Sequence, residues 1–123
     1  MDNTKSLGKT GESIARKYLT EHGYAIIDTN WRRGRHEADI VAYREGMLVF
    51  VEVKTRNSTA YGEPEEFVTL DKQRGYIRLA NAYVMEHNRE EEVRFDVIAI
   101  VMNSTGYRLQ HFENAFSAVS LYL

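Results

Sequence analysis

A short apolar run that ends in charged residues is the strongest constraint on how this chain can fold. Leu48-Val49-Phe50-Val51 is typical of a strand buried on both faces, and Glu52-Val53-Lys54 follows it directly. Because side chains alternate along a strand, Glu52 and Lys54 should point the same way, roughly 7 Å apart. Burying a charge is costly unless it is paired or binds something. The run therefore predicts a core strand that ends either in a binding site or, more plainly, in a Glu–Lys pair that reaches solvent.

A second acidic segment lies one predicted strand upstream, in Glu37-Ala38-Asp39-Ile40-Val41. Strand alternation places Glu37 and Asp39 on one face and Ala38 and Ile40 on the other. That acidic face could be the polar outer side of a half-exposed strand, or it could lie beside Glu52. The second arrangement would bring two carboxylates together where the strands enter the core.

The chemistry that such a cluster supports is metal-dependent phosphodiester cleavage. Asp39 and Glu52 could bind Mg²⁺, with Mn²⁺ as a substitute, because Mg²⁺ prefers oxygen ligands and is often held by one or two carboxylates. Lys54 would orient a metal-activated water and stabilise charge on the phosphate oxygens. Glu12, at the edge of the apolar stripe of the first predicted helix, would complete the shell directly or through water. Its alternative role is that of a first-turn acid that stabilises the helix dipole.

Composition sets outer limits on the class of protein. The 123 residues fit a single domain, 1–123, that can bury one core. Without cysteine there is no disulfide and no thiolate zinc site, so a reducing cytoplasm is expected. No apolar stretch approaches the roughly 18 residues of a membrane-spanning helix, and no membrane partner is expected. A net charge of −2 argues against a protein that coats nucleic acid, because such proteins are strongly basic. It does not exclude a nuclease, whose metal site carries carboxylates.

The hydrophobic pattern predicts an α/β fold with a mixed central sheet and flanking helices. We expect helices at 10–22 and 70–87 and strands at 24–29, 37–43, 47–54, 93–102 and 107–112, the last at an edge. Short links make the first three strands antiparallel, and the helix before the fourth makes a parallel crossover. The long connection at 55–68 is expected to be functional or mobile, and 115–123 to form a short helical turn.

Several basic and acidic side chains could support such a site. The candidates for phosphate contacts are Arg32, Arg33, Arg35, Arg56, Lys72 and Arg74, although solvated surface clusters are the common alternative. Glu37 and Asp96 could support the metal ligands from outside the coordination shell, with a purely structural hydrogen-bonded role as the main alternative for Asp96. Gly8-Lys9-Thr10 is not a phosphate-binding loop, because the required earlier glycine is absent and no strand precedes it.

Taken together, the motifs resemble those of the YraN family of uncharacterised bacterial proteins over nearly the whole chain. The matching segments are Gly8-x-x-Gly11-Glu12, Asn30-Trp31-Arg32, Glu37-x-Asp39, Phe50-Val51-Glu52-Val53-Lys54-Thr55-Arg56, Gly62-x-Pro64 and Arg94-Phe95-Asp96-Val97. One departure is Ala38, where that family usually has Ile between the two acids.

That family in turn resembles the restriction-endonuclease-like superfamily, especially archaeal Holliday-junction resolvases. The resemblance implies an αβββαβ core, here with a fifth edge strand, and a D…E-x-K magnesium site. It makes Asp39 and Glu52 the metal ligands, Lys54 the catalytic lysine and Glu12 the helix acid of the resolvase-like branch.

These observations favour a magnesium-dependent endonuclease that acts on DNA, with branched or otherwise structured DNA among the candidate substrates. A homodimer is compatible with cutting two strands, although the sequence shows no dimer surface. The alternative is a catalytically inactive nucleic-acid-binding module of the same fold. A third class, a protein-interaction domain, would lack salt-dependent affinity for DNA.

Overall fold

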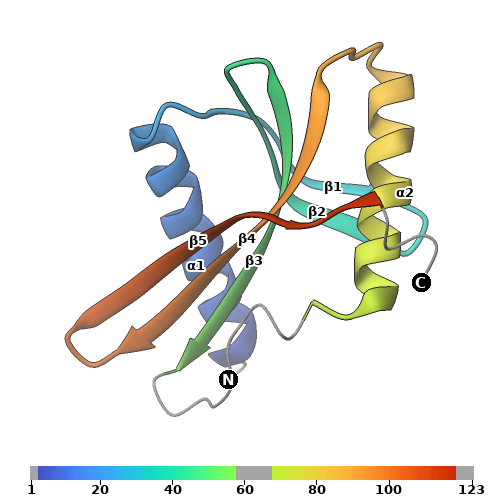
Figure 1. The fold of residues 1–123 in the computed structure, drawn as a ribbon. Helices are drawn as coiled ribbons and strands as arrows, with labels where there is room; N and C mark the ends of the chain where they lie inside the picture. Colours follow the sequence, from blue (N-terminus) through green and yellow to red (C-terminus); the bar gives the residue numbers. More distant parts are fainter. Residues whose placement is uncertain (1–2, 58–67, 119–123) are drawn as a thin grey trace.

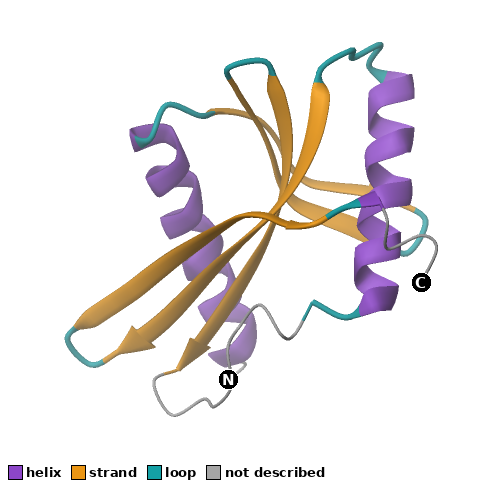
Figure 2. Ribbon diagram, viewed as in Figure 1, coloured by secondary structure: helices purple, strands orange, loops and turns teal. Residues whose placement is uncertain are grey.

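The computed structural model describes residues 3–57 and 68–118, which form one five-stranded sheet with a helix on each face (Figures 1 and 2). The elements are, in chain order, α1 (Asn3–Glu21), β1 (Ala25–Arg33), β2 (His36–Arg44), β3 (Met47–Asn57), α2 (Leu70–Glu86), β4 (Glu92–Asn103) and β5 (Gly106–Phe116). None of the helices within these described ranges is long and apolar enough to cross a membrane.

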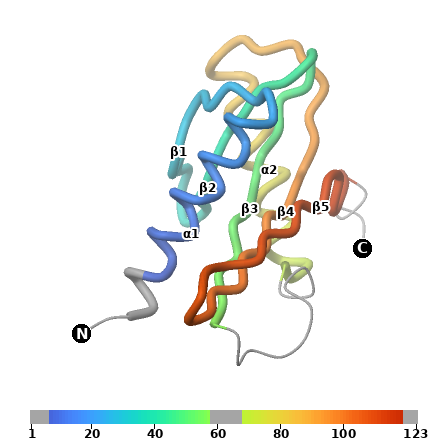
Figure 3. Tube along the Cα trace, turned by 90° about the vertical axis from the view of Figure 1, so that its left-hand side faces the viewer, coloured from blue at the N-terminus to red at the C-terminus, as the bar shows by residue number. Residues whose placement is uncertain are grey.

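The strands lie in sequential order, β1-β2-β3-β4-β5. The first three form an antiparallel meander, as their short links predict. After the α2 crossover, β4 pairs parallel to β3, and β5 returns antiparallel at the edge. Figure 3 shows α1 in front of the strands and α2 behind them. The predicted mixed sheet, with an αβββαβ core and a fifth edge strand, is confirmed.

The core consists of two apolar layers, one under each helix, and β3 contributes to both. Leu48 and Phe50 pack on the α2 side, whereas Val49 and Val51 pack on the α1 side. This alternation explains the continuous apolar run in the sequence, because a central strand covered on both faces needs no polar face. Glu52 continues the alternation on the α2 side and is only 2% exposed.

The strands β2 and β3 separate halfway along the sheet. Their pairing ends at Ile40↔Val51, while β2 stays paired with β1 as far as His36 and β3 stays paired with β4 as far as Asn57. Figure 1 shows the two strands diverging beyond this point, β2 toward α2 and β3 along α1. Polar groups from both strands meet in the opening.

The separation also corrects one prediction about faces. Ala38 packs in the α2-side layer and Ile40 in the α1-side layer, so the two residues do not share a face as expected. The alternation breaks at Asp39, where β2 is no longer held flat against β3 by hydrogen bonds.

Several element boundaries differ from the prediction, mostly because pairing extends the strands. The first helix begins at residue 3 rather than 10. β1 continues to Arg33 because it forms a hairpin with β2 across Gly34 (φ 63°), and β3 continues to Asn57 alongside β4. β5 extends through Phe116, so the prediction of a helical turn at 115–123 is wrong for residues 115 and 116, which belong to the strand. Residues 58–67 of the predicted connection and 119–123 of the tail lie outside the described residues.

Candidate metal and phosphate site

Glu52 is the centre of the site, and both of its carboxylate oxygens have partners. The hydroxyl of Tyr76 donates to Oε1 at 2.7 Å. The ammonium groups of Lys54 (3.5 Å) and Lys72 both lie on Oε2. A buried carboxylate needs such partners, because an unpaired buried charge is strongly destabilising. The predicted contact between Glu52 and Lys54 is present, and α2 brings a second lysine to the same oxygen.

Asp39 lies in the opening between β2 and β3, where its carboxylate takes the place of the backbone carbonyl that would otherwise pair with β3. Its Oδ2 accepts the N–H of Val53 at 2.8 Å, where β2 no longer supplies a carbonyl. The pKa of Asp39 is raised to about 8, first by burial, then by the negative charge of Glu52 and more weakly by that of Glu12, against the lowering effect of the Val53 N–H. The two strand acids therefore lie close enough to repel each other.

This crowding fits a divalent cation. Two carboxylates that disfavour each other's charge in a largely buried place are the donor set that Mg²⁺ uses with waters in its remaining positions. Glu12 is half-buried and accepts a hydrogen bond from Asn30 Nδ2 at 3.2 Å. Among residues 3–57 and 68–118, no three His, Asp or Glu side chains gather closely enough to hold a metal together. Asp39 and Glu52 are therefore the candidate direct ligands, and Glu12 would act through water.

The first two turns of α2 place the partners of Glu52. Thr69 caps the helix by accepting the N–H of Lys72 at 3.1 Å, which sets where the first turn begins. Lys72 and Tyr76 are four residues apart and so lie on one side of the helix. The Tyr76 hydroxyl also accepts the N–H of Asp39 at 3.3 Å, so one side chain connects the helix to both strands.

The two lysines differ in their electrostatics. Burial lowers the pKa of Lys54, and the nearby charge of Lys72 lowers it further, although Glu52 opposes both effects. Burial also lowers the pKa of Lys72, but Glu52 more than compensates, so that the pKa of Lys72 is raised. Two amines thus compete for one carboxylate oxygen, and a phosphate arriving here would meet both.

A cavity of about 200 Å³ opens beside Asp39, Glu52 and Lys72, and we call it the ion-pair cavity. It is lined by Arg35, His36, Glu37, Asp39, Glu52, Lys72 and Tyr76. Gly75 makes room for one wall, since a Cβ there would lie 2.4 Å from the ring Nδ1 of His36. On the other side of the sheet, a Cβ on Gly11 would lie 1.9 Å from Thr55 Oγ1, so this glycine lets α1 approach β3. Close packing at both glycines therefore sets how far the helices stand from the site.

The candidate phosphate-binding residues do not behave as one group. Arg35 and Lys72 line the ion-pair cavity. Arg32 forms an ion pair at 2.7 Å with Glu37, which also lines the cavity. Arg33 pairs with Glu86 on α2. The other two candidates, Arg56 and Arg74, do not line the cavity.

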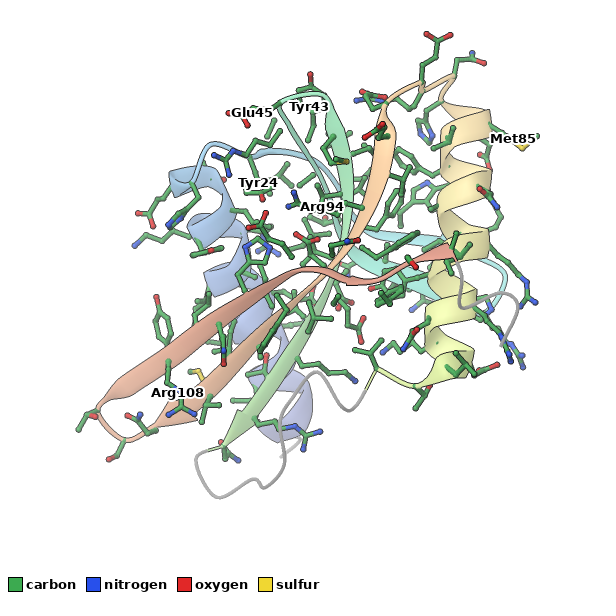
Figure 4. The ribbon with its side chains drawn as sticks, in the orientation of Figure 1. Tyr24, Tyr43, Glu45, Met85, Arg94 and Arg108 are labelled. Atoms are coloured by element: carbon green, nitrogen blue, oxygen red, sulfur yellow. The ribbon has the colours of Figure 1, made fainter. Side chains whose placement is uncertain are left out.

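Asp96 lies away from the site, on the α1 face of β4. Its carboxylate accepts from Arg94 (2.9 and 2.8 Å), from His111 (2.7 Å) and from the N–H of Asn114 (2.9 Å). Figure 4 shows Arg94 close to Tyr24, whose hydroxyl accepts from the guanidinium at 2.6 Å. The side-chain hydrogen bonds and ion pairs of Asp96 within the described residues all go to β4 and β5 and not to Asp39 or Glu52, which favours the structural alternative for this acid.

Two residues of the site were missed in the sequence. Tyr76 was not singled out, although its spacing of four from Lys72 and seven from Tyr83 places it on the inner side of α2. His36, which lines the ion-pair cavity, was not among the candidate residues either. A tyrosine on the buried stripe of a helix is usually a packing residue, so only its hydroxyl contacts identify its role here.

Known proteins resemble this chain over most of its length. The model of a family described as "Uncharacterised protein family UPF0102" matches residues 11–100. A UPF0102 protein of Bacteroides thetaiotaomicron is 45% identical over 94% of this chain and 96% of its own length. One from Flavobacterium psychrophilum is 40% identical over 94% and 98%. A structure of Pyrococcus furiosus SfsA in complex with Ca²⁺ matches at 16% identity and a TM-score of 0.35, covering 92% of this chain and 64% of that one.

Proposed function

This chain belongs to the uncharacterised protein family UPF0102, and from its site we propose that it is a magnesium-dependent nuclease that hydrolyses phosphodiester bonds in DNA. The observation that carries the proposal is the convergence of Asp39, Glu52, Lys54 and Lys72 at the opening between β2 and β3. Carboxylates that can bind a metal ion and amines that can bind a phosphate lie there in contact with one another. That combination fits phosphoryl chemistry better than it fits a purely structural ion pair.

The roles follow from position. Bound by Asp39 and Glu52, Mg²⁺ would make a water easier to deprotonate and withdraw charge from phosphate oxygens. Lys54 would orient that water and donate to the oxygens on which charge develops. Lys72 would hold the phosphate from the α2 side. Tyr76 would keep the Glu52 carboxylate in place through its 2.7 Å hydrogen bond.

A second candidate function has an observation of its own. Both oxygens of Glu52 already have partners, and the two lysine ammonium groups can neutralise its charge in place of a metal ion. Such a closed arrangement suits a nucleic-acid-binding module that keeps the fold but does not catalyse. Binding a metal would require the lysines to move from Oε2 toward a phosphate.

Cleavage assays on a panel of substrates separate the two functions. Purified protein is incubated with single-stranded, flapped, four-way and duplex DNA, in Mg²⁺, in Mn²⁺ and in EDTA. A nuclease should cut at least one substrate with either metal and none in EDTA. Lys54→Ala should lower the rate by about 100-fold or more, and Asp39→Asn should lower both the rate and the affinity for Mg²⁺ measured by calorimetry.

The matched control is Lys17→Ala, which removes an exposed lysine of α1 and should leave cleavage unchanged. DNA binding that falls with salt and survives Lys54→Ala, with no cutting by the wild type, would support the binding module instead. If the wild type neither cuts nor binds any of these DNAs, both proposals fail.

A further inference from the structure

A second cavity opens beside the ion-pair cavity, on the same face of the sheet. It measures about 380 Å³ and is lined by Val68, Gln73, Val97, Phe112, Glu113, Ala115 and Phe116. Its floor is apolar, with Val97 fully buried and Phe116 only 9% exposed. It lies between the start of α2 and the end of β5, which crosses toward α2 in Figure 1. We call it the aromatic pocket.

Three observations place the aromatic pocket directly next to the ion-pair cavity. Glu52 is the cross-strand partner of Val97 on β4, and Val97 is the partner of Phe112 on β5. Val97, on the pocket floor, is therefore one strand spacing of about 4.8 Å from Glu52, and Phe112 is two spacings from it. Consecutive residues of α2 line the two cavities: Lys72 lines the ion-pair cavity and Gln73 lines the aromatic pocket. The rings of Tyr76 and Phe116, one from each cavity, meet edge to face at 6.1 Å. The two cavities therefore share a wall.

Buried Asp96 and its partner Arg94 hold the outer wall of the pocket in shape. The pairing of β4 with β5 shifts between Phe95 and Val97, and the residues of β5 opposite this bulge include Glu113 and Ala115. Asp96 accepts the N–H of Asn114, which lies at a positive φ of 53° in the bulge. Arg94 holds the Glu113 carboxylate at 3.1 Å. The Asp96 network thus fixes one wall of the aromatic pocket, and bulges of this kind are common beside functional sites.

We propose that the aromatic pocket binds one unpaired nucleobase of a DNA strand whose phosphate lies against Lys54 and Lys72. The inference rests on the proposed function, and it deepens that function by naming the substrate class as DNA with an unpaired base next to the bond that is cut. A nucleotide joins its base to its phosphate through one sugar, which is the scale of the separation between the two cavities. Every base has an aromatic face that can stack on Phe112 or Phe116.

Charge favours a base in the pocket over a phosphate. Among the described residues, no lysine or arginine lines the pocket, so no cation there would neutralise a phosphate, and the Glu113 carboxylate is paired with Arg94. Lys72 and Arg35 instead line the neighbouring ion-pair cavity, and Lys54 lies on the Glu52 carboxylate beside it. Intact duplex DNA must unpair a base before it can use such a pocket, whereas single strands and branch points present one at little cost.

The test compares two single strands of equal length and charge, one with normal bases and one built from abasic nucleotides, by fluorescence anisotropy in EDTA. The wild type should bind the base-bearing strand about 5- to 150-fold more tightly, as expected for one stacked base. Phe112→Leu, which keeps apolar bulk and removes the aromatic face, should reduce this ratio. Ala115→Trp, which fills the pocket from an exposed position, should bring it close to one.

The matched control is Tyr107→Ala, which removes an aromatic side chain from the same strand at a position 51% exposed and outside the pocket. It should leave the ratio unchanged. Equal binding of both strands by the wild type, or a ratio that survives both pocket variants, would overturn the inference. If the wild type cuts DNA but shows no base preference, the pocket inference fails alone. If it shows the preference without cutting, the pocket inference is supported and the catalytic proposal fails.

Discussion

Replacing Asp39 by Asn should stabilise the metal-free protein. The Asp39 carboxyl is largely buried beside Glu52, and its pKa is raised from 3.8 to about 8. An amide of nearly the same shape carries no charge, and its Oδ1 can still accept the N–H of Val53. The substitution therefore removes an electrostatic cost while keeping the hydrogen bond, as expected where a functional group is held against stability.

The magnitude and its sign follow from proton linkage. Below the unfolded value of 3.8, this carboxyl is protonated in both states and contributes no pH dependence. As the pH rises from there toward about 8, the unfolded chain releases a proton that the folded chain retains, so wild-type stability falls by about 1.4 kcal/mol per pH unit. At pH 7 the full loss would be about 4 kcal/mol, and because part of the shift comes from the neighbouring charge of Glu52 we expect a gain of about 2–4 kcal/mol for Asp39→Asn. For 123 residues this corresponds to a gain of about 8–16 °C in Tm.

Urea denaturation in EDTA at about pH 5, 7 and 9 measures the effect. The stability gap between Asp39→Asn and the wild type should be small at the lowest pH, grow with pH and level off above pH 8. Glu92→Gln, at an exposed position of β4, should show no such growth. Adding Mg²⁺ should narrow the gap, since a ligand that binds only the folded wild type stabilises it by mass action. An Asn variant that is less stable than the wild type at the highest pH would refute the reasoning.

Two further substitutions test the contacts on either face of the sheet. Tyr76→Phe leaves the buried Glu52 oxygen and the Asp39 N–H without their hydroxyl partner, so the free energy of unfolding at neutral pH should fall by about 2–3 kcal/mol; a loss under about 0.5 kcal/mol would contradict this role. For Asp96, burial raises the pKa, but hydrogen bonds from His111 and Arg94 outweigh it and the pKa is lowered. Asp96→Asn should therefore cost about 3 kcal/mol at neutral pH, and the difference from the wild type should disappear as the pH falls below 3.8, through the folded pKa of Asp96. A difference that persists undiminished in acid would show that the carboxylate charge is not what holds β5.

Much of the fold was predictable because its signals are local. The apolar run before Glu52 indicates a strand covered on both faces, and Leu48 to Val51 do alternate between the two layers. Short links and one helical crossover were enough to predict the meander and the parallel pair. The boundaries were harder, because β1, β3 and β5 continue wherever a neighbouring strand satisfies their backbone, and that pairing is not local.

The candidate site was predictable only as far as strand alternation reaches. The shared face of Glu52 and Lys54 follows from a period of two, and the two side chains do meet. The same rule misplaced Ala38 relative to Ile40, because it assumes an unbroken ladder and β2 leaves β3 at Asp39. It also could not show that Asp96 lies on the other face of the sheet from Glu52.

The amino-acid sequence by itself determined which chemical groups the central strands carry and which face of β3 they occupy, since covalent geometry sets side-chain direction along a strand. Tertiary structure alone decided that Lys72 and Tyr76 of α2 reach Glu52, and that the opening between two strands lets Asp39 bind the Val53 amide. Those contacts join segments far apart in the chain, and they form only when helix packing and strand separation bring the segments together. No local sequence pattern shows which of these distant segments will come into contact.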